Sequence, residues 1–281
     1  MIIWLASYPK SGNTWVRSMI ATLMYTDNGV FNFDLLQQIK QFPSKNYFTN
    51  FTNDFGNIHE IKKYWESAQD LINLDNQVKF LKTHHINCKI DKYNFTSKRN
   101  TLATIYIIRD PRNLVTSISN HYSKSLEDSK NFLLSPRFLT GFKKDGDLEK
   151  DSLKTLLGTW GEHYKFWKNN NENFLLIKYE DLINNTYSEL NKIITFIKKF
   201  TPIQTNEIKN ENIIKTTSFN HLKNLEEKGN FNENAYETID KKKKFFNLGP
   251  ENNWENILDK KIKDEIEAKL SSEMKELEYL S

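Results

Sequence analysis

The chain is poor in the features that mark secreted and membrane proteins. It has 281 residues and a single cysteine, Cys88. One thiol excludes an internal disulfide and fits a reducing compartment, so we expect a cytoplasmic protein. No apolar run approaches the ~20 residues of a membrane span. The run at residues 2–6 is also shorter than the ~7–15 apolar residues of a secretory signal. We therefore predict neither a membrane span nor a signal peptide.

A strong charge of one sign is also missing. Lys and Arg number 40 against 36 Asp and Glu, which leaves a formal net charge of +4. Such a small excess does not require a nucleic-acid partner and is compatible with an anionic small ligand. The sequence has no cluster of His, Cys and Asp with the spacing of a metal site, so no metal is expected. The length suits one large α/β domain, and we expect residues 1–281 to form a single domain.

Short apolar runs predict buried strands, and they fall at residues 2–6, 78–83, 101–108 and 174–179. Helices are predicted to start after Asn13, at Pro111, near Leu153 and near Thr186, with a surface helix over residues 260–279. Apolar strands that alternate with helices predict an α/β fold with a mostly parallel central sheet flanked by helices. Three polar stretches are expected to be least regular, and the first two are candidate acceptor-side loops or lids: residues 25–57, 123–150 and 228–244.

The stretch from Ile2 to Ile20 has the layout of a phosphate cradle. An apolar run leads into a polar loop and then into residues at helical spacing. Amide groups at a helix start favour an anion, and Lys10, Gly12 and Thr14 add a charge, close backbone approach and a hydroxyl. The Gly-x4-Gly-Lys-Ser/Thr order of a nucleoside-triphosphate loop is absent, and with it the hydroxyl that binds Mg²⁺. An ordinary strand–turn–helix connection is the alternative interpretation.

Two further pairs of residues suit anion binding and proton transfer. Arg109 ends a predicted strand, and Ser117 lies about two helical turns later, so both can converge on one phosphate. The alternative is that Arg109 pairs with a carboxylate and Ser117 only packs. Lys82 and His84 are two apart on a strand, which places a cation and a base on one face. His85 faces the other side and is predicted to be structural.

These segments resemble the motifs of the cytosolic-type sulfotransferases, in the family's order. Tyr8-Pro-Lys-Ser-Gly-Asn-Thr-Trp15 is similar to the family's 5′-phosphosulfate loop, YPKSGTTW. Residues 109–117 resemble the 3′-phosphate motif, and Leu81-Lys-Thr-His84 resembles the K-T-H strand end. Tyr179-Glu-Asp-Leu182 resembles the Y-E-D segment, and Thr217-Ser-Phe-Asn-His-Leu-Lys223 resembles T-S-F-x-x-M-K with Leu222 in place of Met.

The resemblance implies a P-loop-like fold that binds 3′-phosphoadenosine 5′-phosphosulfate (PAPS). It implies transfer of the sulfuryl group to a hydroxyl or amine of a small acceptor, with adenosine 3′,5′-bisphosphate (PAP) as product and no metal. His84 would be the general base, and Lys10 and Lys82 would stabilise the transferring group and the leaving phosphate. The implied cofactor-binding residues are Lys10, Ser11, Gly12, Asn13, Thr14, Trp15, Arg109, Ser117, Tyr179, Thr217, Ser218, Phe219, Leu222, Asn247, Leu248 and Gly249.

Roles are also implied for side chains around the adenine. Trp15 and Phe219 stand at the family's adenine-stacking positions, with core packing as the alternative, and Tyr179 would contact the adenine. Glu180 and Asp181 are expected to cap the next helix. Arg112 is expected at the surface or just behind the site.

One segment departs from the family's pattern. The site usually ends with R-K-G-x-x-G-x-W, whereas this chain has Asn247-Leu-Gly-Pro-Glu-Asn-Asn-Trp254. The two basic residues are therefore replaced by Asn247 and Leu248. Lys243, Lys244 or backbone amides near Gly249 are candidates to replace them, and Arg109 and Ser117 would then carry more of the 3′-phosphate recognition.

Two other functions stay open from the sequence. One is a nucleotide or small-molecule kinase on the same fold, against which the missing Gly-Lys-Ser/Thr argues. The other is a non-catalytic nucleotide-binding homologue, against which the joint presence of Lys10, Lys82 and His84 argues. The sequence does not identify the acceptor, and it leaves the oligomeric state, including a homodimer, undecided.

Overall fold

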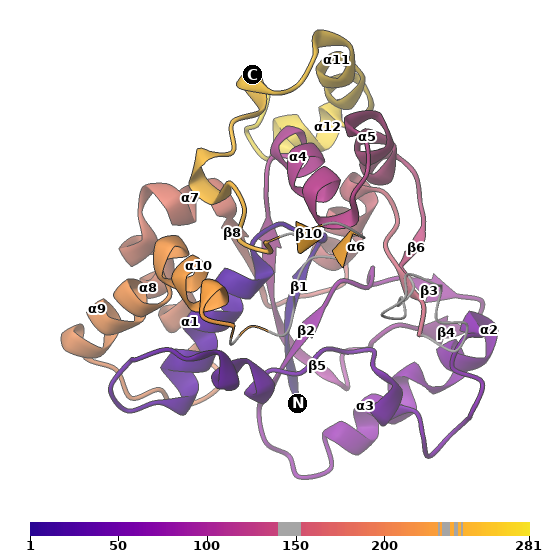
Figure 1. Ribbon diagram of the computed structural model, residues 1–281. Coiled ribbons are helices and arrows are strands. Elements are labelled where there is room, and N and C mark those ends of the chain that lie inside the picture. Colours follow the sequence, from indigo (N-terminus) through magenta and orange to yellow (C-terminus); the bar gives the residue numbers. More distant parts are fainter. Residues whose placement is uncertain (140–152, 230, 232–236, 239–240, 243) are drawn as a thin grey trace. The chain divides into compact units, whose positions relative to one another are not determined.

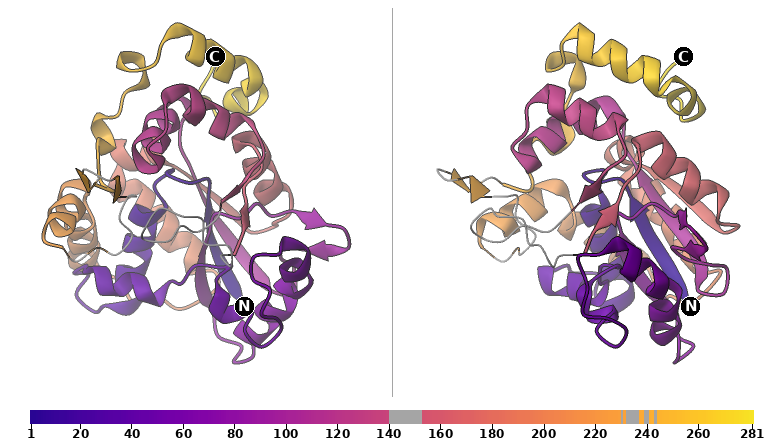
Figure 2. Two further views of the ribbon diagram at one scale, coloured as in Figure 1. Left: turned by 45° about the vertical axis from the view of Figure 1, so that its right-hand side comes forward. Right: turned by 90° about the vertical axis from the view of Figure 1, so that its right-hand side faces the viewer.

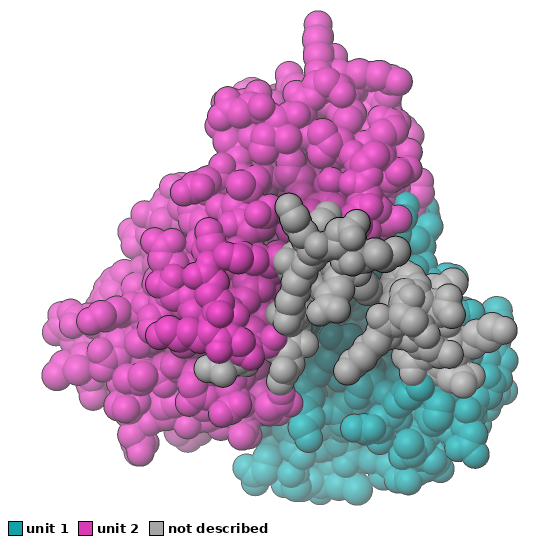
Figure 3. All heavy atoms as spheres, viewed as in Figure 1, with its two compact units in different colours: residues 1–8, 39–106, 136–176 teal, residues 9–38, 107–135, 177–281 magenta. Residues whose placement is uncertain are grey.

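The computed structural model describes residues 1–139, 153–229, 231, 237–238, 241–242 and 244–281. By its internal contacts the chain divides into two compact units, shown in teal and magenta in Figure 3. The first unit comprises residues 1–8, 39–106 and 136–176, and the second comprises residues 9–38, 107–135 and 177–281.

The central sheet has four strands in the order β2-β1-β5-β8 (Figure 1). The strands are β1 (Ile2–Ser7), β2 (Lys79–Thr83), β5 (Thr101–Ile108) and β8 (Phe174–Lys178). The unit boundary passes through β5 after Tyr106 and through β8 after Leu176. β1 and β2 pair in parallel, and β1 is fully buried. The predicted α/β fold with a mostly parallel sheet is confirmed, and the strand predictions agree to within one residue at each end.

Aromatic side chains form the core of the first unit. The Trp4 ring on β1 lies 5.7 Å from Phe42, 5.7 Å from Phe95 and 5.8 Å from Trp167. The indole N–H of Trp4 donates to Thr101 Oγ1 over 2.9 Å, so its one polar atom is satisfied inside the core. Burying each such side chain stabilises the unit by roughly 1.5–3 kcal/mol. Three helices also belong to this unit: α2 (Ile58–Ile61), α3 (Trp65–Ile72) and α6 (Trp160–Asn169). Two short strand pairs join β3 (Lys89–Ile90) with β4 (Tyr93–Asn94) and β6 (Phe138–Leu139) with β7 (Thr155–Leu156). Turns of 3₁₀ helix lie at Lys45–Tyr47 and Lys62–Tyr64.

The predicted helix near Leu153 begins later than its apolar spacing suggested. Thr155 and Leu156 form β7, which pairs with β6, and Gly158 then turns the chain in the left-handed region at φ 68°. Thr159 caps α6 by a capping box with Glu162. The prediction was wrong over residues 153–159 because the local strand pairing and the cap outweigh the apolar periodicity.

The second unit is mostly helical. Its helices are α1 (Asn13–Tyr25), α4 (Pro111–Tyr122), α5 (Leu126–Leu134), α7 (Tyr179–Asn184), α8 (Thr186–Ile197), α9 (Glu207–Thr216), α10 (Phe219–Glu227), α11 (Lys260–Lys269) and α12 (Ser271–Glu276). Helix α9 packs against α1, α8 and α10 (Figure 1), and α11 packs along α4 and α5 (Figure 2). β9 (Glu237–Thr238) pairs with β10 (Lys241–Lys242), and 3₁₀ turns lie at Phe33–Gln38, Gly249–Glu251 and Trp254–Asn256.

Helix starts are confirmed where the sequence carries a cap signal. Asp110 accepts a hydrogen bond from the Arg112 N–H, with Pro111 at the first helical position of α4. Asn185 caps α8 in the same way by accepting from the Ser188 N–H. The predicted surface helix over residues 260–279 is instead two helices, because the chain leaves helical geometry at Leu270.

The stretches expected to be irregular are more ordered than predicted. Residues 126–134 form α5, whose N-cap Ser125 accepts from the Asp128 N–H and whose Phe132 and Leu133 are buried. Within residues 25–57, Phe42 and Phe48 are fully buried. Residues 140–150 of the second stretch and residues 230, 232–236, 239–240 and 243 of the third lie outside the described residues. Among the helices that the structure describes, none is long and apolar enough to cross a membrane.

Candidate functional site

The loop after β1 requires its glycine. Gly12 has φ 101°, and a Cβ atom there would lie 2.6 Å from Cδ2 of Tyr179. Its carbonyl accepts the N–H groups of Trp15 and Val16 over 3.0 and 3.2 Å, which starts α1. Lys10 also has a left-handed backbone, φ 67°, and its Nζ lies 3.4 Å from the centroid of the Phe245 ring. The predicted strand–loop–helix is therefore present, with its backbone packed directly on Tyr179.

Arg109 is the centre of a compact cluster in the second unit. It directly follows β5 and is 5% exposed. Its Nη1 donates to Ser117 Oγ over 3.1 Å and its Nη2 donates to the Gly249 carbonyl over 3.3 Å. The guanidinium carbon lies 4.0 Å from the centroid of the Tyr179 ring. The structure thus brings Arg109, Ser117, Tyr179 and Gly249 together, and the partners of Arg109 among the described residues are a hydroxyl, a carbonyl and a ring rather than a carboxylate.

Aromatic rings extend this cluster. Trp15 meets Tyr179 edge to face, with ring centroids 5.7 Å apart. Burial raises the pKa of the Tyr179 hydroxyl, which keeps it neutral. Phe219 lies against Gly249, where any Cβ would overlap its ring, and meets Phe246 edge to face at 6.0 Å. Of the two predicted adenine-stacking residues, Trp15 therefore adjoins the Tyr179 ring that contacts Arg109, whereas Phe219 lies against Gly249, whose carbonyl accepts from Arg109.

Asn252 is a member of the cluster that sequence reasoning missed. Its side chain is buried, its Oδ1 accepts from Thr116 Oγ1 over 2.6 Å, and its Nδ2 donates to the Asn113 carbonyl over 2.8 Å. The same Nδ2 lies 3.4 Å from Ser117 Oγ. These bonds tie the turn at Gly249 to α4. The sequence feature that could have identified Asn252 is its position, because it stands where the family's pattern has its second glycine.

The other predicted cofactor-binding residues have local roles in this structure. The Thr217 hydroxyl donates to the Ile213 carbonyl at the end of α9, and the Ser218 hydroxyl caps α10. Leu222 is fully buried, whereas Asn247 and Leu248 are exposed. Their part in cofactor binding stays a prediction.

Lys244 and Lys243 were the side chains expected to replace the missing basic pair. The Lys244 ammonium forms an ion pair with Glu227 on α10. Lys243 lies outside the described residues. Arg109 is thus the cation that the structure places at Ser117 and Gly249.

His84 follows β2 in the first unit and is held by two neighbours. Its Nδ1 lies 2.8 Å from the Ser7 carbonyl and 3.2 Å from the Ser7 hydroxyl. Its own carbonyl lies 3.1 Å from Nε2 of His163, whose Nδ1 is 2.8 Å from the Tyr106 hydroxyl. A carbonyl only accepts, so we assign the His163 proton to Nε2 and let Nδ1 accept from Tyr106. Burial lowers the pKa of His163 to about 3, which keeps the ring neutral.

Lys82 lies two residues before His84, and His85 directly follows it. Lys82 is buried on β2, where its N–H donates to Lys40 and its carbonyl accepts from Phe42, both over 2.9 Å. His85 is fully buried and stacks on Phe95 with centroids 4.3 Å apart and planes 1° apart. Burial lowers the pKa of His85 to about 4. The role of His85 is therefore packing, as predicted from its place on the opposite side of the strand.

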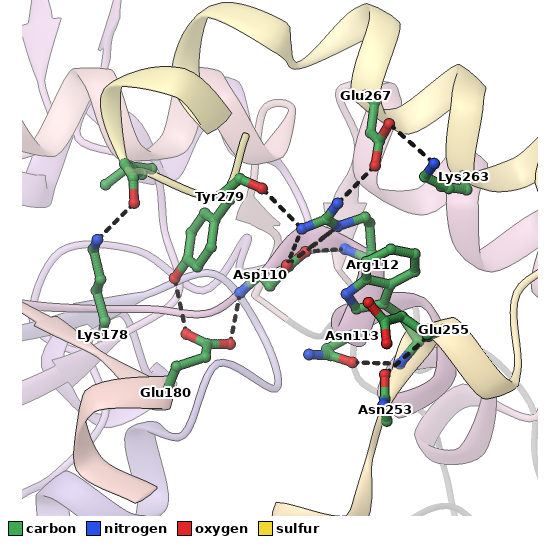
Figure 4. Close-up of polar contacts among 12 residues, drawn as sticks. Asp110, Arg112, Asn113, Lys178, Glu180, Asn253, Glu255, Lys263, Glu267 and Tyr279 are labelled. Atoms are coloured by element: carbon green, nitrogen blue, oxygen red, sulfur yellow. Dashed lines mark hydrogen bonds and ion pairs between the residues drawn. The ribbon is translucent and has the colours of Figure 1, made fainter. Parts of the chain in front are cut away.

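Two neighbouring charged residues differ in outcome. Of the two places expected for Arg112, the surface is excluded, because Arg112 is buried, chelates Asp110 next to Arg109 and pairs with Glu267 at 2.6 Å (Figure 4). The prediction for Glu180 and Asp181 was wrong. Glu180 and Asp181 do not cap a helix, because they lie inside the first turn of α7 and α8 is capped by Asn185. Glu180 instead accepts from the Asp110 N–H and from the Tyr279 hydroxyl. Burial raises the pKa of the Glu180 carboxyl, and these two hydrogen bonds oppose that shift.

The residues present fit a phosphorylated nucleotide. Among the described residues, Ser11 Oγ, Trp15 Nε1 and Arg109 Nε are buried without a hydrogen-bond partner. Buried polar atoms are normally paired, so donors left over in one loop and its neighbours indicate a ligand with acceptor oxygens. The absence of a side chain at Gly12 lets the Tyr179 ring pack directly on this loop at the start of α1, where the helix dipole favours an anion.

Curated relatives resemble the chain over most of its length. It is 27% identical to sulfotransferase 2B1 of Homo sapiens over 199 residues, which cover 69% of this chain and 46% of that protein. It is 24% identical to 3-alpha-hydroxysteroid sulfotransferase of Cavia porcellus over 223 residues, which cover 78% of this chain and 65% of that protein. The chain thus spans less than two thirds of either relative.

A solved structure has the same fold. Mouse sulfotransferase SULT7A1 complexed with PAP matches with a TM-score of 0.61 and 22% identity, covering 98% of this chain and 84% of that one. At this identity the likeness establishes the fold alone. The model of the sulfotransferase domain family matches residues 2–278, and the chain therefore belongs to the sulfotransferase domain family.

Proposed function

We propose that this protein is a PAPS-dependent sulfotransferase that acts on a hydroxyl or amine of a small acceptor. The observation that carries the proposal is the Arg109 cluster, in which a buried guanidinium, a helix hydroxyl and an aromatic ring meet. An adenosine nucleotide with a 3′-phosphate offers the matching anion and the matching flat ring. Membership of the sulfotransferase domain family supports the same reading.

The second unit would hold the nucleotide. Arg109 and Ser117 would bind the 3′-phosphate, with Tyr179, Trp15 and Phe219 against the adenine. The 5′-phosphosulfate would lie on the loop from Lys10 to Thr14, where amide groups and the start of α1 favour an anion. The unpaired Ser11 hydroxyl supports this assignment.

His84 would take the acceptor's proton. Since Nδ1 is engaged by the Ser7 carbonyl, the ring lone pair is at Nε2, which is the atom that would accept the proton. When bound, the donor would supply an electrophilic sulfuryl group to the deprotonating acceptor oxygen or nitrogen. Lys10 and Lys82 would stabilise the negative charge that develops on the leaving phosphate and the transferring group. Ser7 is three residues before Lys10, so the chain itself links the base to the phosphosulfate loop.

A small hydroxylated acceptor is supported by the names of several relatives. They include hydroxysteroid sulfotransferases of Cavia porcellus and flavonol 3-sulfotransferase of Flaveria bidentis. We propose that residues 25–57 and 123–150 lie on the acceptor side within a single functional domain. The acceptor class itself is open to experiment.

The proposal is tested by binding and turnover together. Titration calorimetry should detect PAP binding, and a screen with sulfur-labelled PAPS against phenols, alcohols, amines, glycans and lipid headgroups should yield a labelled product. Transfer of the ATP γ-phosphate without PAP binding would favour a kinase. PAP binding without transfer to any acceptor would favour a non-catalytic nucleotide-binding protein.

A further inference from the structure

Two consecutive residues at the end of β5 face two consecutive residues at the end of β8. Arg109 and Tyr179 form the first pair, with the guanidinium 4.0 Å from the ring centroid. Asp110 and Glu180 form the second, since the Asp110 N–H donates to Glu180 Oε1 over 3.0 Å (Figure 4). The first pair belongs to the candidate nucleotide site, and the second fixes the spacing of the two backbones directly beside it.

The C-terminal segment fastens this second pair. The Tyr279 hydroxyl donates to Glu180 Oε2 over 2.9 Å, and the Tyr279 carbonyl accepts from Arg112 Nη2 over 2.9 Å. Tyr279 therefore bonds the β8–α7 junction through its side chain and the β5–α4 junction through its backbone. With the Asp110 N–H on Oε1, both oxygens of the Glu180 carboxylate are engaged.

Arg112 makes the anchor rigid. Its guanidinium binds both oxygens of Asp110, donates to Glu267 on α11 over 2.6 Å and lies 4.1 Å from the centroid of the Trp254 ring. The side chains of Arg112 and Asp110 are only 9% and 7% exposed, so water screens this pair little. The backbone carbonyl of Tyr279 therefore accepts from a guanidinium that is buried and held in place by Asp110.

We propose that Tyr279 and Glu180 are positioning residues for the nucleotide site. By joining the two strand ends they hold Arg109 over the Tyr179 ring, in the orientation that binds a 3′-phosphate. The inference rests on the proposed function, because it takes Arg109 to be the 3′-phosphate ligand. It adds that Tyr279, 170 residues after Arg109 in the sequence, sets the selectivity of that ligand through its bonds to Glu180 and Arg112.

The test compares two nucleotides on conservative variants. Tyr279→Phe removes one hydroxyl, and Glu180→Gln keeps the shape while placing an amide N–H₂ against a donor. Affinities for PAP and for adenosine 5′-monophosphate are measured by calorimetry, and folding is checked by circular dichroism and thermal melting. Tyr187→Phe on α8 is the matched control, because Tyr187 is 47% exposed.

For both variants we expect the preference for PAP over the monophosphate to fall about tenfold or more, the loss expected when a hydrogen bond to a charged group is removed. The control should keep the preference of the unaltered protein. Unchanged preference in folded Tyr279→Phe and Glu180→Gln would overturn the inference, as would equal losses for both nucleotides. Failure of the unaltered protein to prefer PAP would instead count against the proposed function.

A double variant separates positioning from general destabilisation. In an Arg109→Ala background, Tyr279→Phe should leave the ratio of the two affinities unchanged, because the group that it positions is gone. A further fall of the ratio in that background would show that Tyr279 acts by another route and would contradict the proposal.

Discussion

The Nδ1 atom of His84 lies 2.8 Å from the backbone carbonyl of Ser7. Since a carbonyl can only accept, this contact assigns the ring proton to Nδ1 and the lone pair to Nε2. The His84 carbonyl is held in turn by His163, so both the ring and the backbone of His84 are oriented by buried neighbours. Such a ring is pre-organised to accept a proton at one defined atom.

The first prediction concerns that atom. His84→Asn keeps a side-chain N–H near the position of Nδ1 but has no group at Nε2. We expect its turnover to fall at least about 100-fold, the lower limit for general-base catalysis, while its affinity for PAP stays within about twofold. Steady-state rates with labelled PAPS and calorimetry measure the two quantities. Exposed His59 provides the control variant, His59→Asn. Full activity of His84→Asn would remove the base from the mechanism.

The second prediction concerns Arg109. Arg109→Ala should weaken PAP binding far more than binding of adenosine 5′-monophosphate, because charge-assisted hydrogen bonds to the 3′-phosphate are lost. A change of about 100-fold in the ratio corresponds to about 2.7 kcal/mol. Arg99→Ala is the matched control, since the Arg99 side chain is 69% exposed and pairs with Asp70. Equal weakening for both nucleotides would refute the role assigned to Arg109.

The third prediction concerns Asn252, the residue that links the Gly249 turn to α4. Asn252→Ala removes the buried bonds of the side-chain amide to the Thr116 hydroxyl and to the Asn113 carbonyl, which should lower the free energy of unfolding by about 1–3 kcal/mol. It should also weaken PAP binding, because the turn whose Gly249 carbonyl accepts from Arg109 loses these side-chain bonds to α4. Urea unfolding and calorimetry check both effects. Asn253→Ala, which removes only a local bond to Glu255, should change neither by a comparable amount.

Much of this arrangement follows from short-range signals in the sequence. The apolar run of β1, the Asp110-Pro111 helix start and the order of the motifs predicted the sheet and the approach of Arg109 to Ser117. Such signals act within a few residues or along one strand. They determine where an element ends and therefore which residue stands at each strand end.

The failures concern contacts between residues far apart in the chain. The sequence left Arg112 either at the surface or just behind the site, because nothing in residues 108–116 indicates that Glu267 and Tyr279 cover it. Glu180 was expected to cap a helix because nothing near it in the sequence indicates its true partners. Its carboxylate accepts from the Asp110 N–H and from the Tyr279 hydroxyl, both far away in the chain. Likewise, nothing in the helix predicted near Leu153 singled out His163, although the fold places its Nε2 against the His84 carbonyl. Tertiary hydrogen bonds of this kind leave no periodic trace in the sequence.

The last prediction concerns the pH dependence of stability. Burial lowers the pKa of His85 to about 4 and that of His163 to about 3 from an ordinary value of 6.5. Below pH 6.5 the unfolded chain therefore binds protons at these two histidines that the folded chain does not bind. Their contribution to the free energy of unfolding is complete above pH 6.5 and is lost as the pH drops toward 4. At pH 5 each histidine should lower the free energy of unfolding by about 2 kcal/mol relative to pH 7.5.

A variant isolates the contribution of His85 to this slope. His85→Phe retains a ring to stack on Phe95 but cannot be protonated, and it gives up the bond from Nδ1 to the Ile86 carbonyl. We expect it to be somewhat less stable at pH 7.5, yet to lose about 2 kcal/mol less than the unaltered protein between pH 7.5 and 5. Urea unfolding at the two pH values measures the difference. His59→Phe, at an exposed position, should keep the original slope. An unchanged slope in His85→Phe would mean that the ring is protonated in the folded protein, which its complete burial between Trp65 and Phe95 argues against.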